Sequence, residues 1–131
     1  MVVEVTSAVL ARLLEEAQKA APCECCGVLM GQGTRIDEVR AAANLAPEPE
    51  RRFEIDPLVL LASHKEARAG GRQVVGYYHS HPVGHPVPSA TDCEHASGDR
   101  RVWAIVAGEQ VALWMDAAEG FERIEMRVTE A

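Results

Sequence analysis

The sequence has no long apolar run, no basic excess and no internal repeat. Its longest unbroken apolar stretch, residues 102–107, has six residues, whereas a membrane-spanning helix needs about 20. The first residues show neither a basic start nor a long apolar stretch, so no secretory signal is expected. Lys and Arg number 13 against 20 Asp and Glu, a net charge of −7, which argues against binding to nucleic-acid phosphates. These absences predict a cytoplasmic protein that binds neither membranes nor nucleic acid.

The chain has 131 residues, of which 47% are apolar. This length fits one domain and provides enough apolar surface for a core of its own. No low-complexity tract or linker divides the sequence. We therefore expect a single domain over residues 1–131.

Apolar periodicity and turn residues predict a mixture of helices and strands. Helices are expected at residues 7–22, 57–69 and 89–98, with Thr6 or Ser7, Asp56 and Ser89 as their respective caps. β-Branched, aromatic or alternating segments predict strands at residues 25–30, 35–43, 73–80, 101–107, 110–115 and 121–128, with a short one at 53–55. The fold class is therefore α+β (mixed α/β), a single sheet or partial barrel flanked by helices.

Histidine and cysteine are both clustered. Four of the five histidines fall within 17 residues, and three of the four cysteines fall within four residues. Cys25 and Cys26 are adjacent, and a domain with a full core needs no disulfides. The thiols are therefore expected to be reduced, in agreement with a cytoplasmic location.

The sequence His79-Ser80-His81 closes a predicted strand. Side chains alternate across a strand, so the two imidazoles project from one face and can share a metal ion, while Ser80 points away. Pro82 then ends the strand and leaves the pair where solvent can enter.

A second motif, Ser89-x-x-Asp92, follows after seven residues. It is typical of a helix start, with Ser89 as the cap and Asp92 in the first turn. The carboxylate of Asp92 is also a candidate third metal ligand. Two histidines, one carboxylate and an open position are typical of a catalytic zinc site, although other divalent metals accept the same ligands.

Together these residues resemble the signature of the JAMM/MPN+ metalloprotease family. That signature is a glutamate upstream, then His-x-His, seven residues and Ser-x-x-Asp, and the corresponding residues here are Glu24, His79, His81, Ser89 and Asp92. Residues 22–31 are also similar to the Pro-x-Glu-x-Cys-Gly-x-Leu-x-Gly pattern of the bacterial branch.

The resemblance implies a cytidine-deaminase-like architecture and a zinc-dependent isopeptidase or peptidase with one Zn²⁺ per chain. It implies that His79, His81 and Asp92 bind zinc and that water is the fourth ligand. It further implies that Glu24 is the general base and acid, and that Ser89 holds the tetrahedral oxyanion.

The resemblance also suggests a substrate. Small bacterial members are similar to enzymes that process ubiquitin-like sulfur-carrier proteins ending in Gly-Gly, and this short chain has no room for linkage-selecting insertions. We therefore expect cleavage directly after a carrier's Gly-Gly, with backbone pairing of the tail at a sheet edge. The acidic charge predicts that the carrier's docking face is not strongly acidic. The sequence leaves homodimer formation open.

Three other interpretations stay open at this point. One is a non-catalytic MPN-type binding scaffold, and another is a DNA-repair-associated relative that shares His-x-His. The third is a thiol or cysteine–zinc protein that uses Cys23, Cys26 and Cys93. Cys93 also follows Asp92 directly and, with His85 and His95, is a candidate for the substrate groove or for contacts to the metal ligands.

Overall fold

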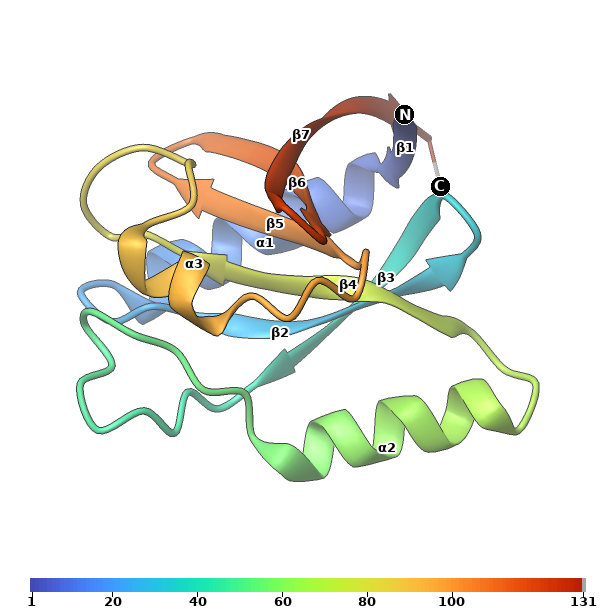
Figure 1. Ribbon diagram of the computed structural model, residues 1–131, viewed down its shortest axis with the longest axis horizontal. Coiled ribbons are helices and arrows are strands. Elements are labelled where there is room, and N and C mark those ends of the chain that lie inside the picture. Colours follow the sequence, from blue (N-terminus) through green and yellow to red (C-terminus); the bar gives the residue numbers. More distant parts are fainter. Residues whose placement is uncertain (131) are drawn as a thin grey trace.

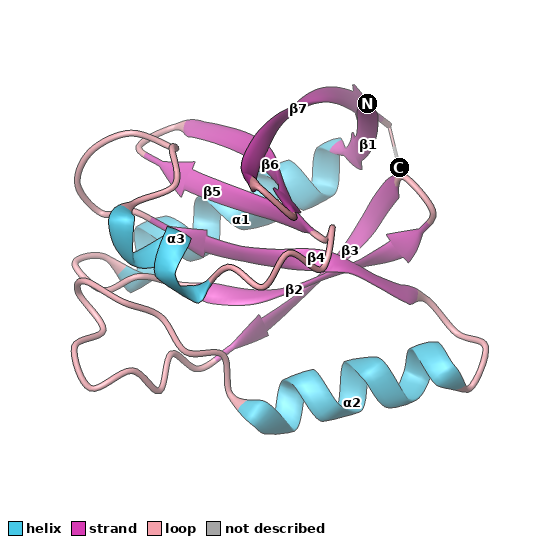
Figure 2. Cartoon of the chain, viewed as in Figure 1, coloured by secondary structure: helices cyan, strands magenta, loops and turns pink. Residues whose placement is uncertain are grey.

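Among the residues that the structure describes, seven strands close into a barrel, and the chain also forms three helices (Figures 1 and 2). The computed structural model describes residues 1–130. The strands follow the order β1-β3-β2-β4-β5-β6-β7 around the barrel. Their bounds are β1 Val2–Thr6, β2 Cys26–Gln32, β3 Arg35–Ala42, β4 Gln73–Ser80, β5 Val102–Ala107, β6 Gln110–Ala117 and β7 Gly120–Thr129. The helices are α1 Ser7–Ala20, α2 Pro57–Arg68 and α3 Ala90–His95. The α+β prediction is confirmed.

The strand that closes the barrel is β1, which the sequence analysis did not predict. It pairs in parallel with β3 on one side and with β7 on the other. Only five residues long, it runs directly into α1, and its inward side chains are Val3 and Val5. Such a short segment has little periodicity of its own, because its partners lie about 30 and 120 residues away in the chain. β1 meets β3 only at Arg35 and Ile36, so the later residues of β3 pair with β2 alone, and backbone pairing of a substrate tail at a sheet edge stays a prediction.

The core lies between α1 and the inner face of the barrel. Val9 and Leu13 of α1 pack with inward residues of the strands, among them Leu29, Tyr78 and Ala104. The Oγ1 atom of Thr6 accepts a hydrogen bond from the Val9 amide at 3.2 Å, so Thr6 rather than Ser7 caps this helix.

The second helix covers the outer face of the barrel. It contacts β4 and β2 and runs along one side of the sheet in Figure 1. Its start is as predicted, because Asp56 caps the helix through the Leu58 amide at 2.9 Å and Pro57 occupies the first turn. Within residues 1–130, no helix combines the length and apolar character that crossing a membrane requires.

The third helix is shorter than predicted and ends at His95 rather than near Gly98. The buried carboxylate of Asp116 on β6 accepts hydrogen bonds from the amides of Ser97 and Gly98 at 2.9 and 3.0 Å. These bonds draw the chain away from the helix axis. A contact between residues about 20 positions apart thus overrides the local helical tendency.

Strands β4 and β5 lie unusually close at Gly76. A Cβ atom added there would lie 1.8 Å from the carbonyl oxygen of Val102. No side chain can be accommodated at this distance, so glycine allows the two parallel strands to pair. This pairing fixes β4, which carries His79 at its end.

Candidate metal centre

Strand register brings the upstream glutamate to the histidine pair. β2 and β4 are antiparallel, and Cys26 pairs with His79. Beyond that pair, the Ser80 amide donates to the Cys25 carbonyl at 3.1 Å, and Ser80 Oγ accepts from the Cys25 amide at 2.8 Å. Glu24 therefore lies beside His81. Ser80 faces away from the imidazoles, as alternation along the strand predicts.

The side chains of His79, His81 and Asp92 converge. The Nε2 atom of His79 lies 3.0 Å from Asp92 Oδ1, and Nε2 of His81 lies 3.1 Å from Asp92 Oδ2. The two Nε2 atoms are 3.2 Å apart. These residues form the one group of three or more histidine, cysteine or acidic ligands that residues 1–130 bring close enough to hold a metal ion.

The hydrogen bonds of His81 fit a cation at this point. Its Nδ1 atom lies 2.9 Å from the carbonyl oxygen of His85, which can only accept, so Nδ1 carries the proton. In the neutral ring, Nε2 then presents its lone pair to the carboxylate of Asp92. Two acceptors that face each other at 3.1 Å need a positive charge between them, which is a proton on Nε2 in the metal-free protein or a metal ion in its place.

The protonation of the group also suits metal binding. Burial alone would raise the pKa of Asp92, but its hydrogen bonds with His79 and His81 outweigh burial and hold that pKa well below the usual value. Burial lowers the pKa of His79 and so favours the neutral ring, whereas the hydrogen bonds of His81 with Asp92 and with the His85 carbonyl outweigh its burial and raise its pKa, so a metal ion would displace a proton from His81. A charged carboxylate and a neutral imidazole are the forms that bind divalent metals.

Asp92 is positioned by the start of α3, which lies beside the end of β4 (Figure 1). Ser89 Oγ accepts from the Asp92 amide at 3.0 Å, and the Ser89 amide donates to Asp92 Oδ2 at 2.9 Å. This reciprocal pair is the predicted capping box. Because Ser89 Oγ is used as an acceptor here, its hydroxyl proton is left to donate elsewhere.

Glu24 lies on the same cavity as His81 and Ser89. The cavity measures about 480 Å³ and is also lined by Glu50 and Arg51. The Glu24 side chain is buried, and this burial raises its pKa to about 7. A carboxyl group with this pKa can both take up and release a proton near neutral pH.

The raised pKa of Glu24 has a consequence for stability. The buried carboxyl keeps its proton until about pH 7, whereas in the unfolded chain it ionises near 4.5. Its favourable contribution is therefore present below pH 4.5 and is lost as pH rises through 7. We expect the metal-free Glu24→Gln variant to gain stability relative to the parent between pH 5 and pH 8, as measured by urea unfolding with chelator. If the difference in the free energy of unfolding between the two proteins does not change with pH, Glu24 is not desolvated.

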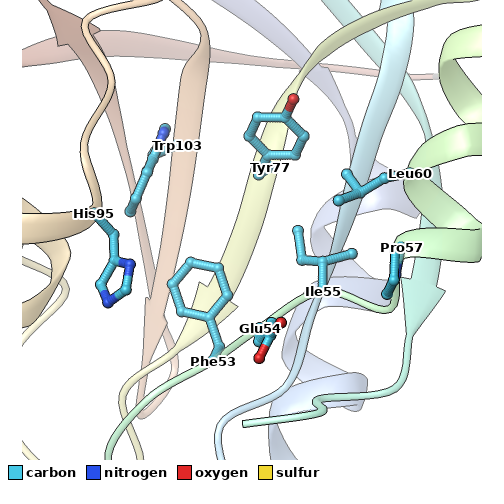
Figure 3. A pocket seen from close by; sticks show the side chains of 8 residues that line it. All are labelled: Phe53, Glu54, Ile55, Pro57, Leu60, Tyr77, His95 and Trp103. Atoms are coloured by element: carbon cyan, nitrogen blue, oxygen red, sulfur yellow. The ribbon is translucent and has the colours of Figure 1, made fainter.

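Aromatic side chains surround His79 on the outer face. The ring of Phe53 stacks on that of His79 with centroids 4.3 Å apart, and Trp103 meets it edge-on at 5.7 Å. The two aromatic residues also line a second cavity of about 370 Å³, together with Tyr77 and His95 and with α2 residues (Figure 3). An apolar cavity thus lies directly behind a candidate metal ligand.

The remaining candidates lie in different places. His85 contributes its backbone carbonyl to His81, while its ring is exposed. His95 is exposed and lines the cavity of Figure 3. Cys93 is exposed on α3 and is not among the converging ligands.

The three upstream cysteines line another cavity beside Glu24 but do not converge on one point. Burial raises the pKa of Cys26 to about 12, and Cys25 is also buried, whereas Cys93 is exposed and Cys23 partly so. We expect a thiol reagent to modify Cys93 first, Cys23 more slowly, and the other two only after denaturation.

The cysteine–zinc interpretation makes a different prediction for the same experiment. It requires added zinc to protect Cys23, Cys26 and Cys93 together. We expect zinc to leave the number of reactive thiols unchanged, as counted by mass spectrometry of the modified protein.

Sequence reasoning missed two residues of this region, Asn44 and Phe53. The short strand expected at 53–55 is a single bridge between Asn44 and Ile55, and nothing in it indicated that Phe53 packs on His79. Asn44 lies two residues beyond the end of β3, in a region where asparagine is common in turns. That position was the one sequence feature that could have indicated a structural role for Asn44.

Comparison with known proteins agrees with these observations. Residues 6–119 match the family model described as prokaryotic homologs of the JAB domain. The chain is 37% identical over 99 residues to a desampylase of Haloferax volcanii, covering 74% of this chain and 71% of that one. It is 30% identical over 115 residues to a probable TtuB-protein conjugate cleaving protease of Thermus thermophilus, covering 77% of each. A solution structure from Desulfitobacterium hafniense superposes with a TM-score of 0.85 at 27% identity, covering 100% of this chain and 94% of that one.

Proposed function

Because the chain belongs to the family of prokaryotic JAB-domain homologues, we propose that it is a zinc-dependent isopeptidase acting on a ubiquitin-like or sulfur-carrier protein. Its cut falls directly after the carrier's C-terminal Gly-Gly. The observation that carries this proposal is the convergence of His79, His81 and Asp92 beside a cavity that also holds Glu24.

His79, His81 and Asp92 hold the metal, through Nε2 of each ring and the carboxylate. This set of two imidazoles and one carboxylate is typical of catalytic zinc, which supplies Lewis acidity and makes hydroxide available near pH 7. The buried position of His79 and the hydrogen bond of His81 to the His85 carbonyl fix the two rings for this task.

Glu24 moves the proton of the reaction. Its carboxylate takes a proton from the attacking water and returns it to the amine that leaves. The burial that raises its pKa to about 7 makes both transfers accessible near neutral pH. Ser89, whose hydroxyl proton is not used in the capping box, donates to the developing oxyanion.

The carrier's tail binds on the outer face, along residues 53–55. This extended segment pairs on one side through Glu54, whose carbonyl accepts from the Leu45 amide at 2.9 Å. Its other side borders the apolar cavity behind His79 (Figure 3). Leu58 and Leu61 of α2, 72% and 63% exposed, form an adjacent apolar surface for the body of the carrier.

The protein acts in the cytoplasm. All four cysteines are free thiols, including the exposed Cys93 and the adjacent pair Cys25 and Cys26. Thiols in this state are typical of a reducing compartment.

The direct test uses a carrier protein extended beyond its Gly-Gly, with mass spectrometry of the products. We expect zinc-dependent cleavage directly after the second glycine, and no cleavage with chelator present. A matched carrier with the same extension but with Ala-Ala in place of Gly-Gly should be cut far more slowly, because side chains there obstruct an extended tail near the metal. A protein that contains zinc but leaves both carriers intact would favour the non-catalytic scaffold.

A further inference from the structure

The side chain of Asn44 is the centre of a hydrogen-bond network beside Glu24. Its Nδ2 group donates to the carbonyl oxygens of Glu24 at 3.0 Å and Arg52 at 2.9 Å, and one of its two protons is shared with the Pro49 carbonyl oxygen at 3.4 Å. Its Oδ1 atom accepts from the amides of Ala46 and Glu54, both at 3.0 Å. One amide side chain thus joins the end of β3 and the loop of residues 45–54 to the segment that carries Glu24.

The network requires both halves of an amide group. Asparagine offers two N–H donors and a carbonyl acceptor on a short side chain. Aspartate would keep the acceptor but place a negative charge against three carbonyl oxygens. Alanine would remove both halves.

Glu24 is held through its backbone rather than through its carboxylate. Its amide donates to the Pro49 carbonyl at 2.8 Å, and its own carbonyl accepts from Asn44. On the other side, the neighbouring Cys25 is bonded to Ser80 of β4. Residues 1–130 provide no hydrogen bond or ion pair to the Glu24 carboxylate, so its location depends on this backbone clamp.

The side-chain amide of Asn44 also bonds to the segment that carries Phe53, on the other side of the site. Glu54, which donates to Asn44 Oδ1, follows Phe53, whose ring stacks on His79. The loop of residues 45–54 also supplies Glu50 and Arg51 to the cavity that contains Glu24. Loss of Asn44 would therefore loosen both Glu24 and the aromatic side chain behind His79.

We propose that Asn44 is a positioning residue, which holds Glu24 at the metal cavity by clamping its backbone to the loop of residues 45–54. This inference rests on the proposed function for the role of Glu24 but not for the network itself. Partners that orient metal ligands typically contribute 10–100-fold to metal affinity or activity, and we take the same range for a residue that orients the general base. We expect kcat of Asn44→Ala to fall by about that factor, with the zinc content retained and with a rise in KM as well, because Asn44 also holds the proposed tail-binding segment of residues 53–55.

Amide exchange followed by NMR tests the clamp without any activity. In Asn44→Ala, the amides of Glu24 and Glu54 should both exchange faster than in the parent. In Asn44→Asp, the Glu24 amide should exchange faster while the Glu54 amide keeps its protection, because the acceptor atom remains. Glu48→Ala, an exposed change in the same loop, is the matched control and should alter neither.

A double-mutant cycle tests whether Asn44 acts through Glu24. With Glu24→Asp, whose carboxylate is already displaced, the further loss caused by Asn44→Ala should be much smaller than in the parent. The proposal would be overturned if the fold-losses in kcat of the two single variants simply multiply in the double variant, or if exchange at the Glu24 amide is unchanged in Asn44→Ala. A parent protein that cleaves no carrier would refute the proposed function instead, and the exchange measurements would still decide the clamp.

Discussion

Replacing Glu24 with Gln is expected to abolish most hydrolysis while the protein keeps its zinc. Gln has nearly the same shape and retains the backbone bonds to Asn44 and Pro49, but it cannot take up and return a proton. Proton transfer by a positioned side chain contributes typically 10²–10⁴-fold to the rate, so kcat should fall by about this range. Initial rates on the extended carrier and the zinc content of the same preparation provide the measurement.

The matched control for this prediction is Glu50→Gln. Glu50 lines the same cavity but is exposed to solvent. Its substitution should change kcat no more than a few-fold, as is usual for an exposed position. Equal losses in the two variants would mean that the charge of the cavity matters, rather than proton transfer by Glu24. Full activity of Glu24→Gln would remove Glu24 from the mechanism.

Replacing Asp92 is expected to remove the metal itself. Asp92 provides the single negative charge among the three converging ligands, and its carboxylate is bonded to both rings. Loss of an outer partner costs roughly 10–100-fold in metal affinity, and loss of a ligand should cost more. We expect Asp92→Ala to retain little zinc after dialysis against chelator, as measured by elemental analysis, and to lose hydrolysis accordingly.

Two further variants separate the metal from the helix start. Asp92→Asn keeps an oxygen that can accept from the Ser89 amide but removes the charge, so it should also lose zinc while α3 stays capped. Glu94→Gln, an exposed change on the same helix, should bind zinc as the parent does. Thermal unfolding adds a second measurement, because zinc should raise the melting temperature of the parent and of Glu94→Gln but not of either Asp92 variant. Normal zinc content in Asp92→Ala would contradict the ligand assignment.

Local patterns in the sequence were sufficient for the parts of the structure that depend on neighbouring residues. The caps at Asp56 and Ser89 were predicted, and Thr6 was one of two candidates for the first helix, because a capping bond joins residues only two or three positions apart. Strand β4 was predicted with its observed bounds, and alternation along it places the two imidazoles together. The spacing from His79 to Asp92 is likewise a pattern within a short stretch of sequence, and it is part of the signature by which the chain resembles the family.

Tertiary structure decided what depends on residues far apart in the chain. Closure of the barrel required β1 to meet β3 and β7, and the early end of α3 required the carboxylate of Asp116. The raised pKa of Glu24 arises from burial, which follows from the register of β2 on β4 and from the loop that Asn44 holds. By itself the sequence determined which chemical groups the protein possesses. It also determined which groups share a face of a helix or strand when they lie a few residues apart. Tertiary packing alone determined how far those groups are shielded from solvent, the distances between them and how rigidly they are held, because desolvation and long-range hydrogen bonds exist only once the chain has folded.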